Sequence, residues 1–147
     1  MILDPAGART LLVRHRALGR WLQPGGHYEP PDSLAASALR EAVEETGLRT
    51  LSLDGGHART GLPIDIDTHR IPARPERDEP EHWHHDMRYL VRASPADALN
   101  PELAEVEGAA WHPVSMLAEI APQTLANLQK LGLVPLPPDK SARAPHI

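Results

Sequence analysis

The chain has no cysteine among its 147 residues. It therefore cannot form disulfide bonds, hold a metal through thiolates or use a cysteine nucleophile. No apolar run approaches the roughly 18 residues of a membrane-spanning helix. The N-terminus also lacks a signal-peptide pattern, because Asp4, Arg9 and Arg14 interrupt any apolar core. These absences lead us to expect a cytoplasmic protein.

Positive charge is scarce as well: 15 Lys and Arg residues face 20 Asp and Glu residues, so the formal net charge is −5. This balance argues against a nucleic-acid polymer or a membrane surface as partner. A phosphorylated small molecule still fits if bound cations supply local positive charge. The length and the 41% hydrophobic content suit one domain with a real core. We expect that domain over residues 1–132 and a proline-rich tail over residues 133–147.

One stretch in the first third of the chain predicts a long helix. Residues 33–46 contain no Pro or Gly and are rich in alanine. Asp32 and Ser33 are good N-cap residues, and Gly47 is a typical stop just past a helix end. Apolar residues recur at helical spacing and predict a buried stripe: Leu34, Ala35, Ala38, Leu39, Ala42 and Val43.

The same helix gathers three glutamates on one side. Glu41 is three residues before Glu44 and four before Glu45, so the three side chains share a face. Hard cations such as Mg²⁺ prefer a few carboxylates together with waters and substrate phosphates. Arg40, four residues before Glu44, is placed to hold that carboxylate. A solvated acidic surface is the alternative, but the preceding Pro24-Gly25-Gly26 turn favours a site, because a metal motif needs such context.

Residues 26–48 resemble the box of the Nudix hydrolase (MutT-like) family. The residues in register with the family pattern are Gly26, Arg40, Glu41, Glu44, Glu45, Gly47 and Leu48. Asp32 departs from the pattern, which has Glu there, but that position caps the helix more than it does chemistry. A looser resemblance runs from Thr10 to about Leu117 and includes the Trp21-Leu22-Gln23-Pro24 and Trp111-His112-Pro113-Val114 segments.

The resemblance implies an α+β fold, a Nudix-type α/β/α sandwich with a mixed β-sheet. It also implies a Mg²⁺- or Mn²⁺-dependent hydrolase that cleaves a pyrophosphate bond in a nucleoside diphosphate linked to another moiety. The residues expected to bind metal are Glu41, Glu44, Glu45 and the carbonyl of Gly26. The residues expected to act in catalysis are Glu44, Glu45, Arg40 and Glu105. A plain charged loop is the alternative for Glu105, which lies six residues before Trp111.

Five of the nine histidines lie between residues 57 and 85. His82, His84 and Asp86 share one face of a predicted strand, and His69 lies on a neighbouring one. Three interpretations stay open for this group: contacts to substrate from His69, His84 and Asp86, a second metal site, or a solvated strand face. The alternation also predicts that Trp83, on the opposite face, packs into the core with Tyr89.

Further elements follow from pattern and turn signals. We expect strands at residues 10–14, 51–57, 63–71, 83–93 and 109–113, and a mostly helical segment at 115–131 that is interrupted near Pro122. Compared with the family, few residues precede Thr10. This leaves open whether an edge strand is missing, shortened or supplied by a partner, such as the second copy in a homodimer.

Two other functions compete with the hydrolase. An isopentenyl-diphosphate isomerase would also pair the box with histidine-bound metal, but it depends on a catalytic cysteine, which this chain lacks. A catalytically silent binding or regulatory domain would be favoured by loss of a box glutamate, and all three are present. A metal-binding β-barrel built on the histidines conflicts with the long helix. Substrate identity is left open, because pocket loops set specificity.

Overall fold

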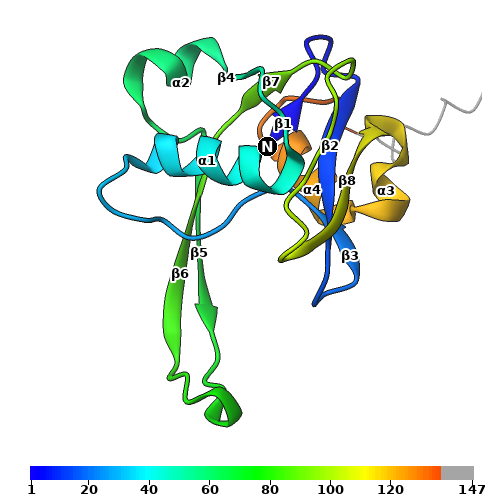
Figure 1. Ribbon diagram of the computed structural model, residues 1–147. Coiled ribbons are helices and arrows are strands. Elements are labelled where there is room, and N and C mark those ends of the chain that lie inside the picture. Colours follow the sequence, from blue (N-terminus) through cyan, green and yellow to red (C-terminus); the bar gives the residue numbers. More distant parts are fainter. Residues whose placement is uncertain (137–147) are drawn as a thin grey trace, which may run out of the picture.

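The computed structural model describes residues 1–136, and Figure 1 shows its arrangement. The strands are β1 (Ile2–Leu3), β2 (Arg9–His15), β3 (Arg20–Leu22), β4 (Leu51–Leu53), β5 (Asp65–Ile71), β6 (His82–Arg88), β7 (Val91–Ala93) and β8 (Val106–Pro113). The helices are α1 (Leu34–Thr46), α2 (Gly55–Thr60), α3 (Leu117–Ile120) and α4 (Pro122–Lys130), with 3₁₀ turns η1 (Pro75–Arg77) and η2 (Val114–Met116). Within these residues, no helix has the length and apolar content needed to cross a membrane.

A mixed sheet forms the centre of the protein. Its strands run in the order β3-β2-β1-β7-β4, and β8 pairs along β2. The pairing of β1 with β7 is parallel, whereas β1 with β2, β2 with β3, β2 with β8 and β4 with β7 are antiparallel. Short antiparallel connections and one parallel pair are typical of an α+β sheet.

Helices cover both faces of this sheet, because neighbouring residues of a strand point to opposite sides. Leu11 belongs to the buried cluster under α1, together with Ala42 and Leu48. Leu12 belongs to the other cluster, which contains Leu117 of α3 and residues of α4. The α/β/α sandwich expected from the sequence is therefore confirmed (Figure 1).

Helix α1 begins and ends as its capping residues predict. The Ser33 side chain accepts a hydrogen bond from the Ala36 N–H at 3.1 Å, and Gly47 closes the helix in the left-handed conformation, with φ of 72°. The predicted stripe is partly wrong, since Leu34 and Val43 are exposed. Their places against the sheet are taken by other α1 residues, which are buried: Ser37, Glu45 and Thr46.

The N-terminal segment supplies a strand in the middle of the sheet. β1 lies between β2 and β7, and its Ile2 and Leu3 side chains are buried on opposite faces. The Asp4 carboxylate holds the following turn by accepting from the Ala8 N–H at 2.7 Å. A two-residue strand carries too few residues for its periodicity to be read from the sequence.

β5 and β6 form a separate two-stranded hairpin that extends from the body (Figure 1). Its base is fixed by Asp65, whose carboxylate accepts from Arg88 at 2.5 Å and from Lys130 of α4 at 2.9 Å. The predicted core position of Trp83 is wrong, because this side chain is 60% exposed on the hairpin. Tyr89, beyond the end of β6, is buried as expected.

Two strand boundaries also differ from the predictions. The strand expected over residues 51–57 ends at Leu53, and Gly55 begins α2 instead of closing a strand. The strand expected over residues 83–93 is interrupted after Arg88, where the chain passes from the hairpin into the sheet. Leu133 and Val134 pack against the core, although we assigned them to the tail. Residues 137–147 of the predicted tail lie outside the described residues.

The two helix C-caps in glycine allow a matched test of packing at the end of α1. Gly47 and Gly61 both have φ near 70°, but a Cβ on Gly47 would overlap the Asn100 backbone, whereas a Cβ on Gly61 meets nothing within 4 Å. We expect Gly61→Ala to cost about 1 kcal/mol of unfolding free energy, from the left-handed backbone alone. Gly47→Ala should cost about 2–4 kcal/mol, because overlap adds to strain. Equal losses of unfolding free energy for the two variants in urea unfolding would contradict the close approach of Gly47 to the Asn100 backbone.

Candidate metal centre

A crowd of carboxylates surrounds Arg40 on α1. Its Nη1 lies 3.1 Å from Glu41 Oε1 and 3.1 Å from Glu44 Oε2, so it contacts two box glutamates at once. The same guanidinium lies 3.6 Å from Glu29 and 3.9 Å from Asp32. One arginine thus faces four carboxylates, and the local charge stays strongly negative.

The glycine turn before α1 folds back onto the box glutamates. The Gly25 N–H donates to Glu45 Oε2 at 2.9 Å, which orients that carboxylate. Gly26 lies so close to the Glu41 carboxylate that any Cβ on Gly26 would overlap it. With a larger residue at position 26 the Glu41 carboxylate would have to move, so glycine lets the backbone lie next to Glu41, as a metal site using the Gly26 carbonyl would require.

The loop between β7 and β8 is tied to the end of α1. The Asn100 N–H donates to the Thr46 carbonyl at 3.0 Å, and the Glu102 N–H donates to the Glu44 carbonyl at 2.8 Å. Arg16 holds the far end of this loop, because its guanidinium donates to the Leu103 carbonyl at 2.9 Å. These bonds bring the loop that carries Glu105 alongside the box.

Burial and mutual repulsion disfavour the charged forms of two box glutamates. Burial raises the pKa of Glu45 above its usual value, the Gly25 N–H opposes that rise, and the charges of Glu41, Glu105 and Glu44 add to it. Burial likewise raises the pKa of Glu41, partly offset by Arg40. A divalent cation would relieve this repulsion, so these residues fit a Mg²⁺ or Mn²⁺ site.

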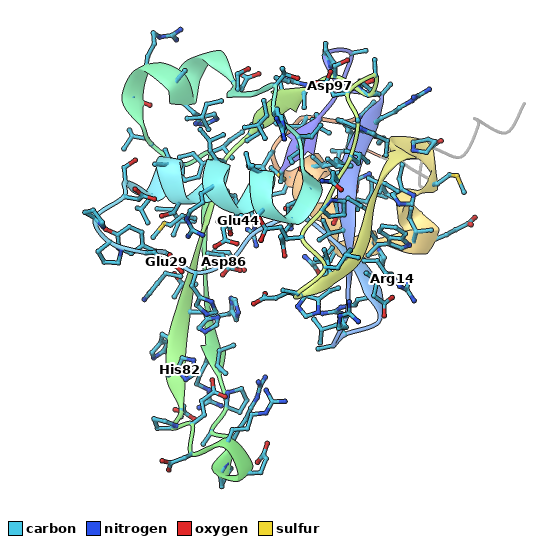
Figure 2. All side chains as sticks on the ribbon, viewed as in Figure 1. Arg14, Glu29, Glu44, His82, Asp86 and Asp97 are labelled. Atoms are coloured by element: carbon cyan, nitrogen blue, oxygen red, sulfur yellow. The ribbon has the colours of Figure 1, made fainter. Side chains whose placement is uncertain are left out.

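The predicted substrate residues lie on the hairpin rather than in the wall of the sandwich. His69 and His84 are cross-strand partners with ring centroids 5.7 Å apart, and Asp86 pairs with Asp67 two rungs nearer the body. The shared face of His82 and His84 is confirmed by their ring contact at 5.0 Å. Asp86 lies toward the α1 end of the hairpin and His82 toward its tip (Figure 2). Their contact with substrate stays a prediction.

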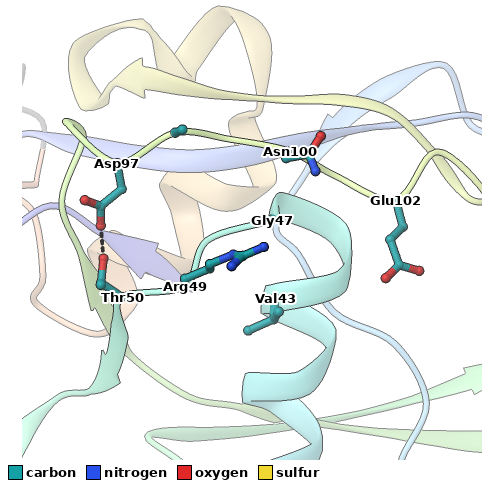
Figure 3. Close-up of a pocket in the computed structure, with 8 residues that line it drawn as sticks. Val43, Gly47, Arg49, Thr50, Asp97, Asn100 and Glu102 are labelled. Atoms are coloured by element: carbon teal, nitrogen blue, oxygen red, sulfur yellow. Dashed lines mark hydrogen bonds between the residues drawn. The ribbon is translucent and has the colours of Figure 1, made fainter.

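A surface depression lies beside the C-terminal end of α1 (Figure 3). It is lined by Val43, Gly47, Arg49, Thr50, Asp97, Ala98, Asn100 and Glu102. Its Asp97 and Thr50 side chains already hydrogen-bond each other. The depression contains none of the three box glutamates, so the chemistry is assigned to the carboxylate cluster instead.

Three contributors to the centre escape sequence reasoning. Glu29 stands in the loop before α1 with no pattern to mark it, yet it approaches Arg40. Asn100 and Glu102 act through their backbone N–H groups, which any residue type but proline provides. The sequence gives no sign of these three residues. It does mark Gly25 and Gly26, because a glycine pair just before a carboxylate-rich helix indicates a turn that contacts the helix.

Comparisons with known proteins agree with this geometry. The family model described as NUDIX domain matches residues 1–131. A Lactococcus lactis protein named "Probable DHNTP pyrophosphohydrolase" is 31% identical over 98 residues, which cover 67% of this chain and 53% of that protein. The chain spans about half the length of the first curated relatives it matches.

Two solved structures support the fold. A NUDIX-family hydrolase from Clostridium perfringens superposes with a TM-score of 0.64 at 22% identity, covering 88% of this chain and 90% of the other. A C. elegans Ap4A hydrolase in a binary complex gives a TM-score of 0.61 at 18% identity, with coverages of 89% and 91%. The chain therefore has the fold of these proteins.

The raised pKa of Glu45 predicts a stability gain when its charge is removed. A carboxyl whose pKa is higher in the folded than in the unfolded protein binds its proton more tightly when folded, so stability falls as pH rises through this window. Without metal, we expect Glu45→Gln to stabilise the protein at pH 7 by about 0.5–2 kcal/mol, since Gln still accepts from Gly25.

The gain should shrink as pH falls through the raised pKa of Glu45, because the wild-type carboxyl becomes neutral too. Urea unfolding in a chelator at pH 7 and at pH 4 measures both effects. Glu44→Gln is the matched control, since Glu44 is 40% exposed and paired with Arg40, and it should show no such gain. A Glu45→Gln protein that is less stable than wild type at pH 7 would contradict the idea that burial and neighbouring carboxylates make the charged form of Glu45 unfavourable.

Proposed function

Since the chain belongs to the Nudix family, we propose that it is a divalent-metal-dependent hydrolase of a pyrophosphate bond. Its substrate would be a nucleoside diphosphate linked to another moiety, and its metal Mg²⁺ or Mn²⁺. The observation that carries the proposal is that Arg40 contacts both Glu41 and Glu44, while Glu45, whose pKa is raised by burial and by their negative charges, lies beside them on the same helix face. Family relatives named for pyrophosphate and Ap4A chemistry support the substrate class.

The three glutamates and the Gly26 carbonyl would hold the cation. When bound, it would offset the negative charge of the substrate phosphates and make water more acidic. Arg40 orients Glu41 and Glu44 through its Nη1, and the Gly25 N–H orients Glu45. Such supports fix ligand geometry before a metal arrives.

Glu105 would accept the proton. Two observations support this role: the Glu105 charge adds to the rise that burial causes in the pKa of Glu45, and the loop that carries Glu105 is tied to α1. Water oxygen attacks one phosphorus of the pyrophosphate, its proton passes to the Glu105 carboxylate, and the bond from that phosphorus to the bridging oxygen breaks. Two phosphorylated products leave, and the proton returns to solvent. His69, His84 and Asp86 would contact the substrate from the hairpin.

Charge removal at the box should abolish turnover without unfolding the protein. We expect Glu44→Gln and Glu45→Gln each to lower kcat/KM by at least about 100-fold, because metal binding and water activation fail together. Glu105→Gln should lower kcat similarly. Glu102→Gln and Glu107→Gln are matched controls from the same region, since Glu102 lines the separate depression and Glu107 faces Arg14.

The assay is a panel of nucleotides, nucleotide sugars and dinucleoside polyphosphates with Mg²⁺ or Mn²⁺, with products separated by anion-exchange chromatography. Near wild-type kcat for either box variant at saturating Mg²⁺ would remove that residue from the metal assignment. If Glu105→Gln kept full activity, the proton acceptor would have to be another group.

Metal should also stabilise the free protein. A ligand that binds only the folded state raises stability by about 2.7 kcal/mol at one hundred times its Kd. We therefore expect millimolar Mg²⁺ to raise the Tm by several degrees over a chelator control, and the Glu44→Gln/Glu45→Gln double variant to lose this response. An unchanged wild-type melting curve would contradict a preformed metal site.

A further inference from the structure

The hairpin of β5 and β6 carries a second group of metal-ligating side chains, separate from the box. One ligand atom each from Asp67, His69 and Asp86 lies within 4.8 Å of the others. Asp67 and His69 stand two residues apart on β5, and Asp86 faces Asp67 across the ladder on β6. The register thus places all three on one face of the ribbon.

We propose that this group, Asp67, His69 and Asp86, is a Zn²⁺ site that clips the two strands of the hairpin together. Imidazole nitrogen with carboxylate oxygens suits zinc, whereas the all-oxygen box suits Mg²⁺ or Mn²⁺. A tetrahedral zinc ion with bonds of about 2.0–2.2 Å spaces its ligand atoms about 3.4 Å apart. The ligand atoms lie within 4.8 Å of one another, so binding would require them to approach by about 1.4 Å at most. His84, across the ladder from His69 with ring centroids 5.7 Å apart, lies outside this three-residue group, so a water would fill the fourth position.

The strongest sign of a ligand is the imidazole itself. His69 Nδ1 is shielded from solvent and has no hydrogen-bond partner among the described residues. It faces the Asp67 carboxylate at 3.5 Å, beyond good hydrogen-bond length for that pair. The His69 side chain is 43% exposed as a whole, so it is this one nitrogen, turned toward the Asp67 carboxylate, that lacks both solvent contact and, within residues 1–136, a hydrogen-bond partner. A ring nitrogen placed in this way beside a carboxylate suits a zinc ligand.

Charge around the group points the same way. Asp67 and Asp86 are directly opposed, and like charges in that position are destabilising. Arg88 approaches Asp67 at 3.3 Å and Asp86 at 3.9 Å, but its closest contact, at 2.5 Å, is with Asp65. With Lys130 also on Asp65, three carboxylates face two cationic side chains, which leaves one negative charge.

The architecture explains the use of such a clip. A two-stranded ribbon is marginally stable in water unless it packs against something. The polar group stands partway along the hairpin, beyond the anchor that Asp65 makes with the body. An ion joining β5 to β6 there adds its binding free energy to the fold of the arm.

The test separates this site from the box by first replacing the three box glutamates, so that the box no longer binds metal. In a Glu41→Gln/Glu44→Gln/Glu45→Gln background, calorimetric titration with Zn²⁺ should still show one equivalent bound. Adding His69→Ala should remove that equivalent or weaken it at least about tenfold. The matched control is His85→Ala. His85 lies on β6 with its side chain on the opposite face of the hairpin, bonded to Thr68, and its removal should keep the equivalent. Circular dichroism checks that each variant is folded.

A second variant and a second probe guard against misfolding. Asp67→Asn keeps the side-chain shape and should also weaken zinc binding at least about tenfold. Co²⁺ in place of Zn²⁺ should give visible absorption bands of a four-coordinate ion, lost with His69→Ala and kept with His85→Ala. The proposal is overturned if the box-silenced protein takes up no zinc, if uptake survives both site variants, or if His85→Ala loses it equally. Because the readout is zinc in a protein whose box glutamates are replaced, none of these results bears on the roles proposed for the box glutamates and Glu105. They decide whether His69 and Asp86 hold zinc or are left to contact substrate.

Discussion

Repulsion between carboxylates on α1 is the constraint that shapes this protein. Three glutamates stand on one turn of one helix, and within the described residues the ion pairs of Glu41 and Glu44 all go to Arg40. A soluble helix would ordinarily turn such a face to water, where screening is strong. Here burial raises the pKa of Glu45 and Glu41 instead, so folding retains an electrostatic cost that a cation would remove. This electrostatic cost, present before any cation binds, is what would favour cation binding.

The hydrogen bonds that end α1 also assemble the rest of the centre. A helix leaves its last carbonyls without partners, and here Thr46 and Glu44 receive the N–H groups of Asn100 and Glu102. Gly47 allows this approach, since a side chain there would meet the Asn100 backbone. The cap, the loop and Glu105 therefore form one unit. A glycine at the end of the box helix thereby fixes the course of the loop that carries Glu105.

Sequence reasoning succeeded where the chemistry is local. The caps of α1, the strand at β2 and the α/β/α layering follow from side chains within a few residues of one another. It failed where the surroundings decide: alternation predicted a core face for Trp83, but the strand leaves the body and both faces of the ribbon meet solvent. Glu29 had no signal, because its role depends on where a loop crosses α1.

The chain thus holds two negative clusters that are compensated in different ways. At the box, one guanidinium is shared among four carboxylates, all hard oxygen ligands, and the remaining charge calls for a hard cation that also meets phosphate. On the hairpin, Arg88 and Lys130 offset most of the charge, and an imidazole nitrogen joins the carboxylates. The hairpin group therefore has less negative charge for a cation to neutralise, and its nitrogen ligand favours a softer ion such as Zn²⁺. Ligand chemistry, rather than total charge, therefore distinguishes what each cluster would select.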